Sequence, residues 1–185
     1  MSVTMLVNVE KHKGSLKKAS YDSANKESLI GDEEQEVYIL DDIAKEIAGK
    51  LEIETPSSCD SVVINNEKIY MIEFKNRHYK SVTSNDKREI RKKAYQSREI
   101  LLSTLLREQN INYIAEHVQL FVVFKSMEGE SESFDKIAGA FNRFANGNEP
   151  EIKCKLSYFE GSFYKKVRTM SKEEFEKIYM KQIFA

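Results

Sequence analysis

Residues 57–75, SSCDSVVINNEKIYMIEFK, contain two apolar segments separated by the polar residues Asn65 to Lys68. Two short apolar segments on either side of a polar turn predict an antiparallel β-hairpin. Because side chains alternate between the two faces of a strand, the hairpin fixes which residues share a face. This segment therefore constrains the fold more than any other part of the chain.

The length of the turn sets the register of the hairpin. With a turn of four residues, Ile64 pairs with Ile69 and Asp60 lies directly opposite Glu73, with Cβ atoms about 5 Å apart. A tighter turn of two residues places Asp60 opposite Met71 and diagonal to Glu73, at about 7–8 Å. Both registers leave the two carboxylates on one face, close enough to share a cation.

The ionisable residues at this end of the hairpin are Asp60, Glu73 and Lys75. Two neighbouring carboxylates repel each other unless a positive charge lies between them, and Mg²⁺ prefers one or two carboxylates together with water and phosphate oxygens. A lysine beside such a site can orient the attacking water or stabilise negative charge. The pattern predicts phosphodiester hydrolysis with Mg²⁺, which Mn²⁺ could replace. The competing interpretation is an ordinary charged sheet end, because a second Glu-x-Lys triplet occurs at Glu151 to Lys153.

With these residues the chain resembles the PD-(D/E)xK nuclease superfamily, over about residues 40–126. Asp60 and the triplet Glu73-Phe74-Lys75 stand where that family has its motif residues, although Cys59 replaces the proline before the aspartate. The resemblance implies that Asp60 and Glu73 bind the metal and that Lys75 is catalytic. It also implies a metal-binding carboxylate on the first helix, for which Glu46 and Asp42 are the two candidates.

The fold that the resemblance implies is α/β, with a restriction-endonuclease-like αβββαβ core and a mixed central sheet flanked by helices. A C-terminal helix, β-hairpin and helix are expected to follow. We expect an N-terminal strand and flexible segment in residues 1–36 and a single nuclease-like domain in 37–185, with its core at about 37–126 and an extension at 127–185.

Periodicity and capping signals place the individual elements. They are an edge strand within 1–10, a loop at 11–35, a helix at 37–51, a long helix at 86–109, a buried strand at 117–125, a helix at 134–144, strands at 152–157 and 162–168, and a last helix from Ser171. The nearly continuous apolar sequence of 117–125 is typical of a strand buried on both faces and paired in parallel.

Basic residues dominate after the hairpin, although the formal net charge of the chain is only -1. Such a patch beside a metal site favours contact with nucleic-acid phosphates. The predicted contact residues are Arg77, Lys80, Arg88, Arg91, Lys92, Tyr95 and Arg98. The alternative is a solvated helix face that pairs with the acidic first helix, and Tyr95 in that case packs at the edge of the apolar stripe.

Other classes of protein find little support. The two cysteines, Cys59 and Cys154, form no zinc-binding or disulfide pattern, and no glycine-rich phosphate loop is present. No apolar segment approaches the ~20 residues of a membrane span, which predicts a soluble, cytoplasmic protein without membrane contact.

We expect a nuclease that acts on nucleic acid, with DNA favoured, and a homodimer fits the prevalence of twofold symmetry. A catalytically silent binding, immunity or regulatory protein and an RNA-cleaving toxin stay open as alternatives.

Overall fold

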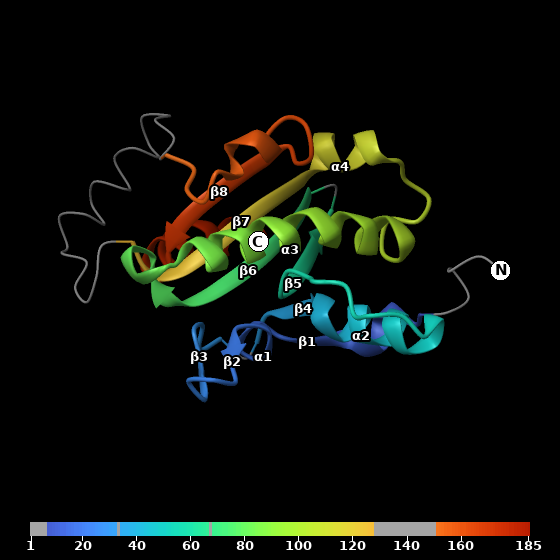
Figure 1. Ribbon diagram of the computed structural model, residues 1–185, viewed down its shortest axis with the longest axis horizontal. Coiled ribbons are helices and arrows are strands. Elements are labelled where there is room, and N and C mark those ends of the chain that lie inside the picture. Colours follow the sequence, from blue (N-terminus) through green and yellow to red (C-terminus); the bar gives the residue numbers. More distant parts are fainter. Residues whose placement is uncertain (1–6, 33, 67, 128–150) are drawn as a thin grey trace.

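The computed structural model describes residues 7–32, 34–66, 68–127 and 151–185, which form a mixed six-stranded sheet with helices on both faces (Figure 1). The order across this sheet is β1-β4-β5-β6-β7-β8. Its strands are β1 (Lys13–Ser15), β4 (Glu36–Ile39), β5 (Ser61–Asn65), β6 (Lys68–His78), β7 (Val118–Ser126) and β8 (Lys166–Ser171). The short strands β2 (Tyr21–Asp22) and β3 (Glu27–Ser28) form a separate pair. The α-helices are α1 (Leu16–Ala19), α2 (Leu40–Leu51), α3 (Ser84–Ser103), α4 (Ile111–His117), α6 (Lys172–Glu174) and α7 (Met180–Phe184).

The predicted hairpin is confirmed, and its register is the one that places Asp60 opposite Glu73. In the antiparallel pair β5–β6, Val62 lies opposite Met71 and Ile64 opposite Ile69. The backbone N–H of Asp60 continues this ladder with a hydrogen bond to the carbonyl of Ile72. The parallel pairing of β7 with β6 is also confirmed.

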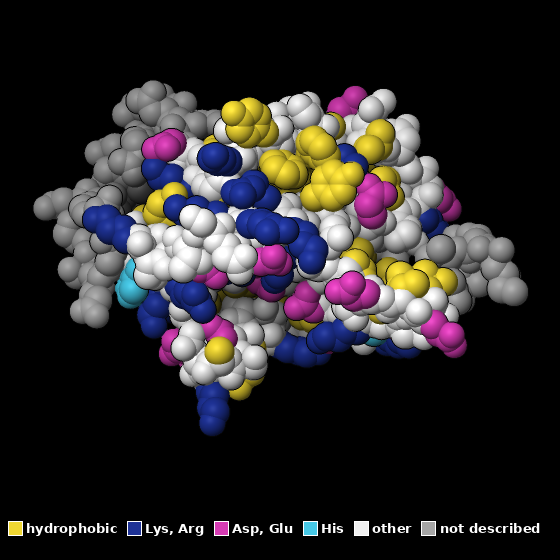
Figure 2. Space-filling view, viewed as in Figure 1, with side chains coloured by type: hydrophobic (Ala, Val, Ile, Leu, Met, Phe, Trp, Pro, Cys, Tyr) yellow, Lys and Arg dark blue, Asp and Glu magenta, His cyan; other side chains and the backbone are white. Residues whose placement is uncertain are grey.

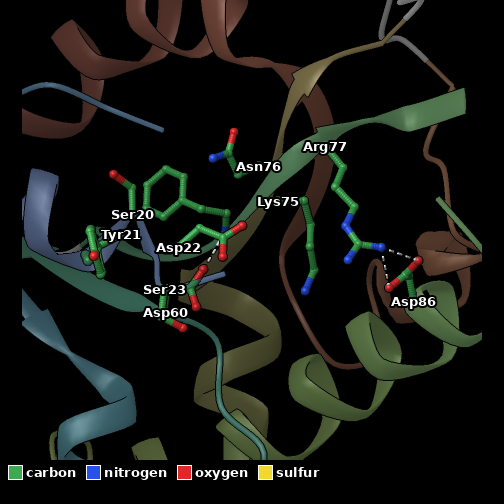
Figure 3. A pocket seen from close by; sticks show the side chains of 11 residues that line it. Ser20, Tyr21, Asp22, Ser23, Asp60, Lys75, Asn76, Arg77 and Asp86 are labelled. Carbon is green, nitrogen blue, oxygen red and sulfur yellow. Dashed lines mark hydrogen bonds and ion pairs between the residues drawn. The ribbon is translucent and has the colours of Figure 1, made fainter. Parts of the chain in front are cut away.

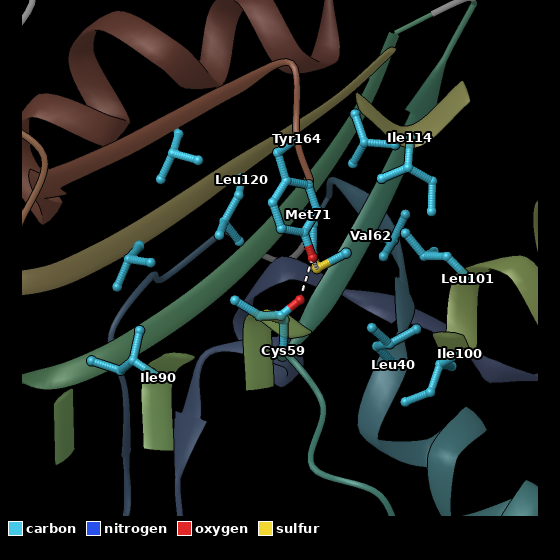
Figure 4. Packing of buried hydrophobic residues seen from close by; sticks show 14 of the residues in the cluster. Leu40, Cys59, Val62, Met71, Ile90, Ile100, Leu101, Ile114, Leu120 and Tyr164 are labelled. Carbon is cyan, nitrogen blue, oxygen red and sulfur yellow. Dashed lines mark hydrogen bonds between the residues drawn. The ribbon is translucent and has the colours of Figure 1, made fainter. Parts of the chain in front are cut away.

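Alternate residues of the hairpin pack into two separate hydrophobic cores, one on each face of the sheet. Val62, Ile69 and Met71 face α2 and α3, and there the hydroxyl of Tyr164 donates a hydrogen bond to the carbonyl of Ala94 (Figure 4). Tyr70, Ile72 and Phe74 face the opposite side, which α1 and the C-terminal helical segment cover. Glu73 has the same parity as Met71, so its side chain points to the α3 face.

The predicted loop at 11–35 is wrong. This segment contains β1, α1 and the β2–β3 pair, and Leu16 and Ile30 are fully buried against the sheet. Serine side chains fix these short elements: the Ser15 hydroxyl caps α1, and Ser20 hydrogen-bonds both the N–H and the carbonyl of Ile30. The predicted strand within 1–10 lies partly outside the described residues, and Val9 begins a 3₁₀ turn (Val9–His12) rather than extending a strand.

The bounds of two helices differ from the prediction: α2 begins three residues later, and the long helix begins two residues earlier and ends six residues earlier. Residues 37–39 belong to β4, and α2 begins at Leu40. The long helix has its capping box at Thr83 and Asp86, not at Asp86 and Glu89, and it ends at Ser103. A 3₁₀ turn (Tyr79–Ser81) precedes it, and the short helix α4 follows it.

The order of the elements differs from the expected uninterrupted meander. Along the chain, only β5 and β6 lie between α2 and α3. The third strand of the expected meander is β4, which pairs with β5 but comes before α2. The mixed α/β architecture with helices on both faces of the sheet is confirmed at that coarser level.

The C-terminal strand predicted at 152–157 is wrong, and the strand predicted at 162–168 is displaced, since only residues 166–168 of that range belong to a strand. Leu156–Phe159 forms a 3₁₀ turn, and the one strand in this region, β8, pairs in parallel with β7 rather than forming a hairpin. The last helical segment does begin at Ser171, whose hydroxyl accepts a hydrogen bond from the N–H of Glu174; it continues through a π-helical turn (Phe175–Tyr179) into α7. The predicted helix at 134–144 lies outside the described residues.

Within the described part of the chain, no helix combines the length and the apolar composition needed to cross a membrane.

Candidate active site

Backbone and side-chain contacts hold Asp60 and Glu73 at the junction of the hairpin with α3. The carbonyl of Asp60 accepts from the N–H of Leu40, and its carboxylate accepts from the N–H of Phe74 at 2.5 Å. The preceding loop is tied to α3, because the Ser97 hydroxyl accepts from the N–H of Cys59. These contacts fix the aspartate beside the strand that carries Glu73.

Two lysines hold the buried carboxylate of Glu73, whose side chain is 1% exposed. Lys75 Nζ lies 2.9 Å from Glu73 Oε1. Lys93 Nζ, from α3, lies 3.0 Å from Glu73 Oε2 and 3.3 Å from Asp60 Oδ1. The ammonium group of Lys93 therefore bridges the two carboxylates that the sequence predicted to share a cation.

Lys93 was not among the predicted site residues, although the sequence contains a signal for it. It stands three residues after Ile90 and four before Ser97, both buried on the inner face of α3. A charged residue within the apolar stripe of a helix needs an internal partner, because an unpaired buried charge is costly.

Burial and mutual repulsion perturb the acid–base behaviour of this cluster. Burial first, and the negative charge of Glu73 second, raise the pKa of Asp60 to about 7. Burial opposes the charged form of Lys93, but the carboxylates of Glu73 and Asp60 outweigh it and raise the pKa of that lysine. In the same way, burial opposes the charge of Lys75, and Glu73 raises its pKa. The cluster therefore retains both ammonium groups, while one of its carboxylates is close to its protonation point at neutral pH.

The donor set suits a small, hard cation with open coordination positions. Glu73 Oε1 is buried and, although it is near Lys75, has no hydrogen-bond partner in the described part of the chain. The two carboxylates already converge on one positive atom, and hard cations such as Mg²⁺ bind carboxylate oxygens. No group of three or more His, Cys, Asp or Glu side chains suited to a metal occurs among the described residues. Asp60 and Glu73 would thus be the protein ligands, with water or substrate oxygens completing the shell.

A cavity of about 250 Å³, here called the site pocket, opens beside Asp60 and Lys75 (Figure 3). One wall comes from the end of β6 and the start of α3, where Arg77 forms an ion pair with Asp86 at 3.3 Å. The opposite wall is the segment Ala19–Ser23, which leads into the β2–β3 pair. The N-terminal segment that was predicted to be a loop therefore forms half of the pocket.

The structure separates the two predicted first-helix candidates, Glu46 and Asp42. Glu46 contacts Lys11, His12 and Lys50, and it lines neither cavity that reaches Asp60. Asp42 lines the second of these cavities, together with Asp41. The negative charge of Asp41 also contributes to the raised pKa of Asp60, so Asp41 and Asp42, rather than Glu46, are the α2 carboxylates on the side of the site.

The predicted nucleic-acid contacts separate into exposed and buried residues. Lys and Arg side chains gather around α3 on the face seen in Figure 2. The exposed members are Arg77, Lys80, Arg88, Lys92 and Tyr95, and Arg91 is half-buried. Arg98 is only 8% exposed, and its guanidinium lies 4.5 Å from the ring centre of Phe163. Arg98 is therefore a packing residue of this helix, and the other six stay candidates for contact with a ligand.

Comparison of the chain with protein-family models, with curated proteins and with solved structures gives no match.

Proposed function

We propose that this protein is a metal-dependent nuclease that hydrolyses phosphodiester bonds, with DNA as the favoured substrate. The observation that carries the proposal is the buried cluster of two carboxylates and two lysines at the edge of the polar site pocket. Burying four ionisable groups together is expensive, and apolar residues of similar volume would stabilise a fold equally well. Such perturbed clusters beside a cleft are typical of catalytic sites.

The resemblance to the PD-(D/E)xK superfamily supports the same function through Asp60, Glu73 and Lys75. The position of α2 between β4 and β5 departs from the core order that the resemblance implies. The proposal therefore rests on the geometry of the cluster more than on the fold.

In this proposal Asp60 and Glu73 would hold one divalent cation, and the chemistry that it would supply is polarisation of the scissile phosphate and acidification of water. Glu73 also orients Lys75, whose ammonium group at the pocket edge is placed to stabilise negative charge that develops on the phosphate. Lys93 neutralises the two carboxylates before substrate enters, which keeps them close together. The Ala19–Ser23 segment forms one wall of the pocket in which the substrate would lie.

The test is cleavage of supercoiled plasmid, linear DNA and total RNA by the purified protein with Mg²⁺ or Mn²⁺. EDTA and Glu73→Ala are the paired controls, and circular dichroism checks that the variant is folded. Cleavage that is lost in both controls supports the nuclease and names its substrate. Cleavage of RNA in preference to DNA would identify the RNA-cleaving alternative, and no cleavage of any substrate would refute the nuclease.

A catalytically silent binding protein is the second candidate, and the position of Lys93 favours it. An ammonium group that already bridges Asp60 and Glu73 satisfies both carboxylates without a metal. In that case the cluster is structural, and the basic face around α3 would serve binding alone. Metal binding to the carboxylates distinguishes the two candidates.

A further inference from the structure

A second cavity, here called the basic pocket, lies between the start of α3 and the 151–158 segment, with a volume of about 530 Å³. Its charged and aromatic lining residues are Lys87, Arg91, Lys153, Lys155, Glu151, Tyr79 and Tyr158. Four of these side chains are cationic, and only Glu151 is acidic. The pocket therefore concentrates positive charge from two segments that are far apart in the sequence.

Within the part of the chain that the structure describes, most of this positive charge has no acidic partner. Glu151 forms an ion pair with Lys153. Among the described residues, no carboxylate lies within ion-pair distance of Lys87, Arg91 or Lys155. Lys87 instead lies 5.2 Å from the ring centre of Tyr79. Like charges gathered in this way repel each other, and an anionic ligand would relieve the repulsion.

The backbone of the 151–158 segment is held in an unusual conformation at the pocket. Cys154 and Lys155 both have positive φ angles, 60° and 58°, which residues with a side chain adopt at a cost. Arg91 donates a hydrogen bond of 2.9 Å to the carbonyl of Cys154 and so ties this turn to α3. The tie brings Lys155 to the same pocket as the guanidinium group of Arg91.

The basic pocket adjoins the site pocket. Asp86 lines the site pocket, and the next residue, Lys87, lines the basic pocket, so the first turn of α3 separates the two. The two pockets therefore lie beside the same turn of α3.

We propose that the basic pocket binds a backbone phosphate of the same nucleic-acid strand whose scissile phosphodiester lies in the site pocket. This inference rests on the proposed function, and it adds the requirement that the substrate extends beyond the scissile bond. Lys87, Arg91 and Lys155 supply the positive charge. Tyr158, which is 79% exposed at the pocket, presents a ring on which a neighbouring base can stack, as aromatic residues beside basic grooves do in proteins that bind single strands. The exposed ring favours a nucleotide over a free inorganic anion.

The test compares two double variants that lose the same charge. Lys87→Gln/Lys155→Gln changes the basic pocket, whereas Lys68→Gln/Lys181→Gln changes exposed lysines at the β5–β6 turn and on α7. Binding of a fluorescein-labelled single-stranded DNA 12-mer is measured by anisotropy over a series of salt concentrations, in EDTA to prevent cleavage. The plot of log K against log salt has a negative slope. For single strands, each phosphate contact that is lost reduces the magnitude of this slope by about 0.7.

We expect the basic-pocket variant to bind the 12-mer more weakly at low salt and to show the smaller slope, while the control variant matches wild type. Equal slopes in the two double variants would overturn the inference, and so would a wild-type protein that does not bind the 12-mer. Inorganic phosphate is added as a competitor. If it displaces the 12-mer at the same phosphate concentration as unlabelled DNA does, the assignment to a nucleic-acid backbone is refuted.

A small substrate separates this inference from the proposed function. Bis(p-nitrophenyl) phosphate offers one phosphodiester and no neighbouring phosphate, so with Mg²⁺ the basic-pocket variant should hydrolyse it as fast as wild type. A loss of hydrolysis in that variant would contradict a role limited to the extended strand. If wild type binds DNA with the expected salt dependence but hydrolyses nothing, the nuclease is refuted, and only the binding of a strand phosphate in the basic pocket stands.

Discussion

Lys93 is the residue whose removal most directly tests the physical description of the site. Lys93→Met keeps most of the volume of the side chain and leaves Asp60 and the second oxygen of Glu73 without their shared cation. Removing one partner from a buried ion pair costs about 3–5 kcal/mol. Because the side chains of Lys93 and Asp60 are 22% and 15% exposed and Lys75 still contacts Glu73, we expect the lower end of that range.

The assay is urea unfolding in EDTA at pH 8, which lies above the raised pKa of Asp60, about 7. If the free energy of unfolding falls by about 3 kcal/mol and depends on urea with a slope of about 2 kcal/mol per M, the midpoint of unfolding falls by about 1.5 M urea. Lys92→Met is the matched control, because this neighbouring lysine is exposed and surface substitutions usually stay within about 0.5 kcal/mol. If Lys93→Met unfolds at the same urea concentration as the control, the bridging role of Lys93 is refuted.

Mg²⁺ gives the same experiment a second readout. In the Lys93→Met variant the two carboxylates are free to take a divalent cation, and Mg²⁺ at 100 times its dissociation constant would return about 2.7 kcal/mol. Wild type should gain less, because the cation must displace an ammonium group that is already bound. Equal gains in wild type, Lys93→Met and Lys92→Met would contradict competition between Lys93 and the cation, and no gain in any of the three would contradict a metal site between Asp60 and Glu73.

Three further predictions concern individual side chains. Glu73→Gln should abolish metal-dependent cleavage, whereas Glu54→Gln, at an exposed position after α2, should leave it unchanged; a parallel cleavage assay decides, and equal loss in both would refute the assignment. Folding raises the pKa of Asp60 from 3.8 to about 7. The free energy of unfolding of the metal-free protein should therefore fall as the pH rises between these two values, by at most ~4 kcal/mol from this group. The Asp60→Asn variant has no carboxylate to ionise at this position. Its free energy of unfolding, measured with urea, should therefore rise relative to that of wild type between pH 4 and pH 8. A difference in unfolding free energy that does not change with pH would contradict the raised pKa. Leu16→Ala should cost about 2–5 kcal/mol, since Leu16 is fully buried, and a cost near zero would mean that the N-terminal segment is not part of the core.

The hairpin was predictable from the sequence because strand parity and turn position are local properties. Once Ile64 and Ile69 are paired, the position of Asp60 opposite Glu73 follows without any knowledge of the rest of the fold. The continuous apolar sequence of β7 similarly indicated a strand covered on both faces.

The N-terminal segment was not predictable from periodicity because its elements are too short to show any. α1 has four residues and β2 and β3 have two each, and single apolar residues such as Leu16 and Ile30 attach them to the core. Hydrogen bonds such as those of Ser20 to Ile30 depend on tertiary contact and leave no pattern in the sequence. Half of the site pocket was missed for this reason.

The site itself was only partly predictable. Asp60, Glu73 and Lys75 follow from the hairpin, but the contact of Lys93 depends on how α3 packs across the sheet. The choice among the carboxylates of α2 depends on where that helix begins, and the prediction began it three residues early, in β4. Helical spacing alone could not decide which carboxylate faces Asp60.

The central claim is that Asp60 and Glu73 together bind one divalent cation, and electron paramagnetic resonance of Mn²⁺ measures this directly. Free Mn²⁺ is titrated into wild type and into the folded variant Glu73→Gln at equal protein concentration. We expect wild type to remove one Mn²⁺ per chain from the free signal and the variant to lose that site. The same free Mn²⁺ signal with both proteins would contradict the account and leave the cluster as a structural ion-pair network.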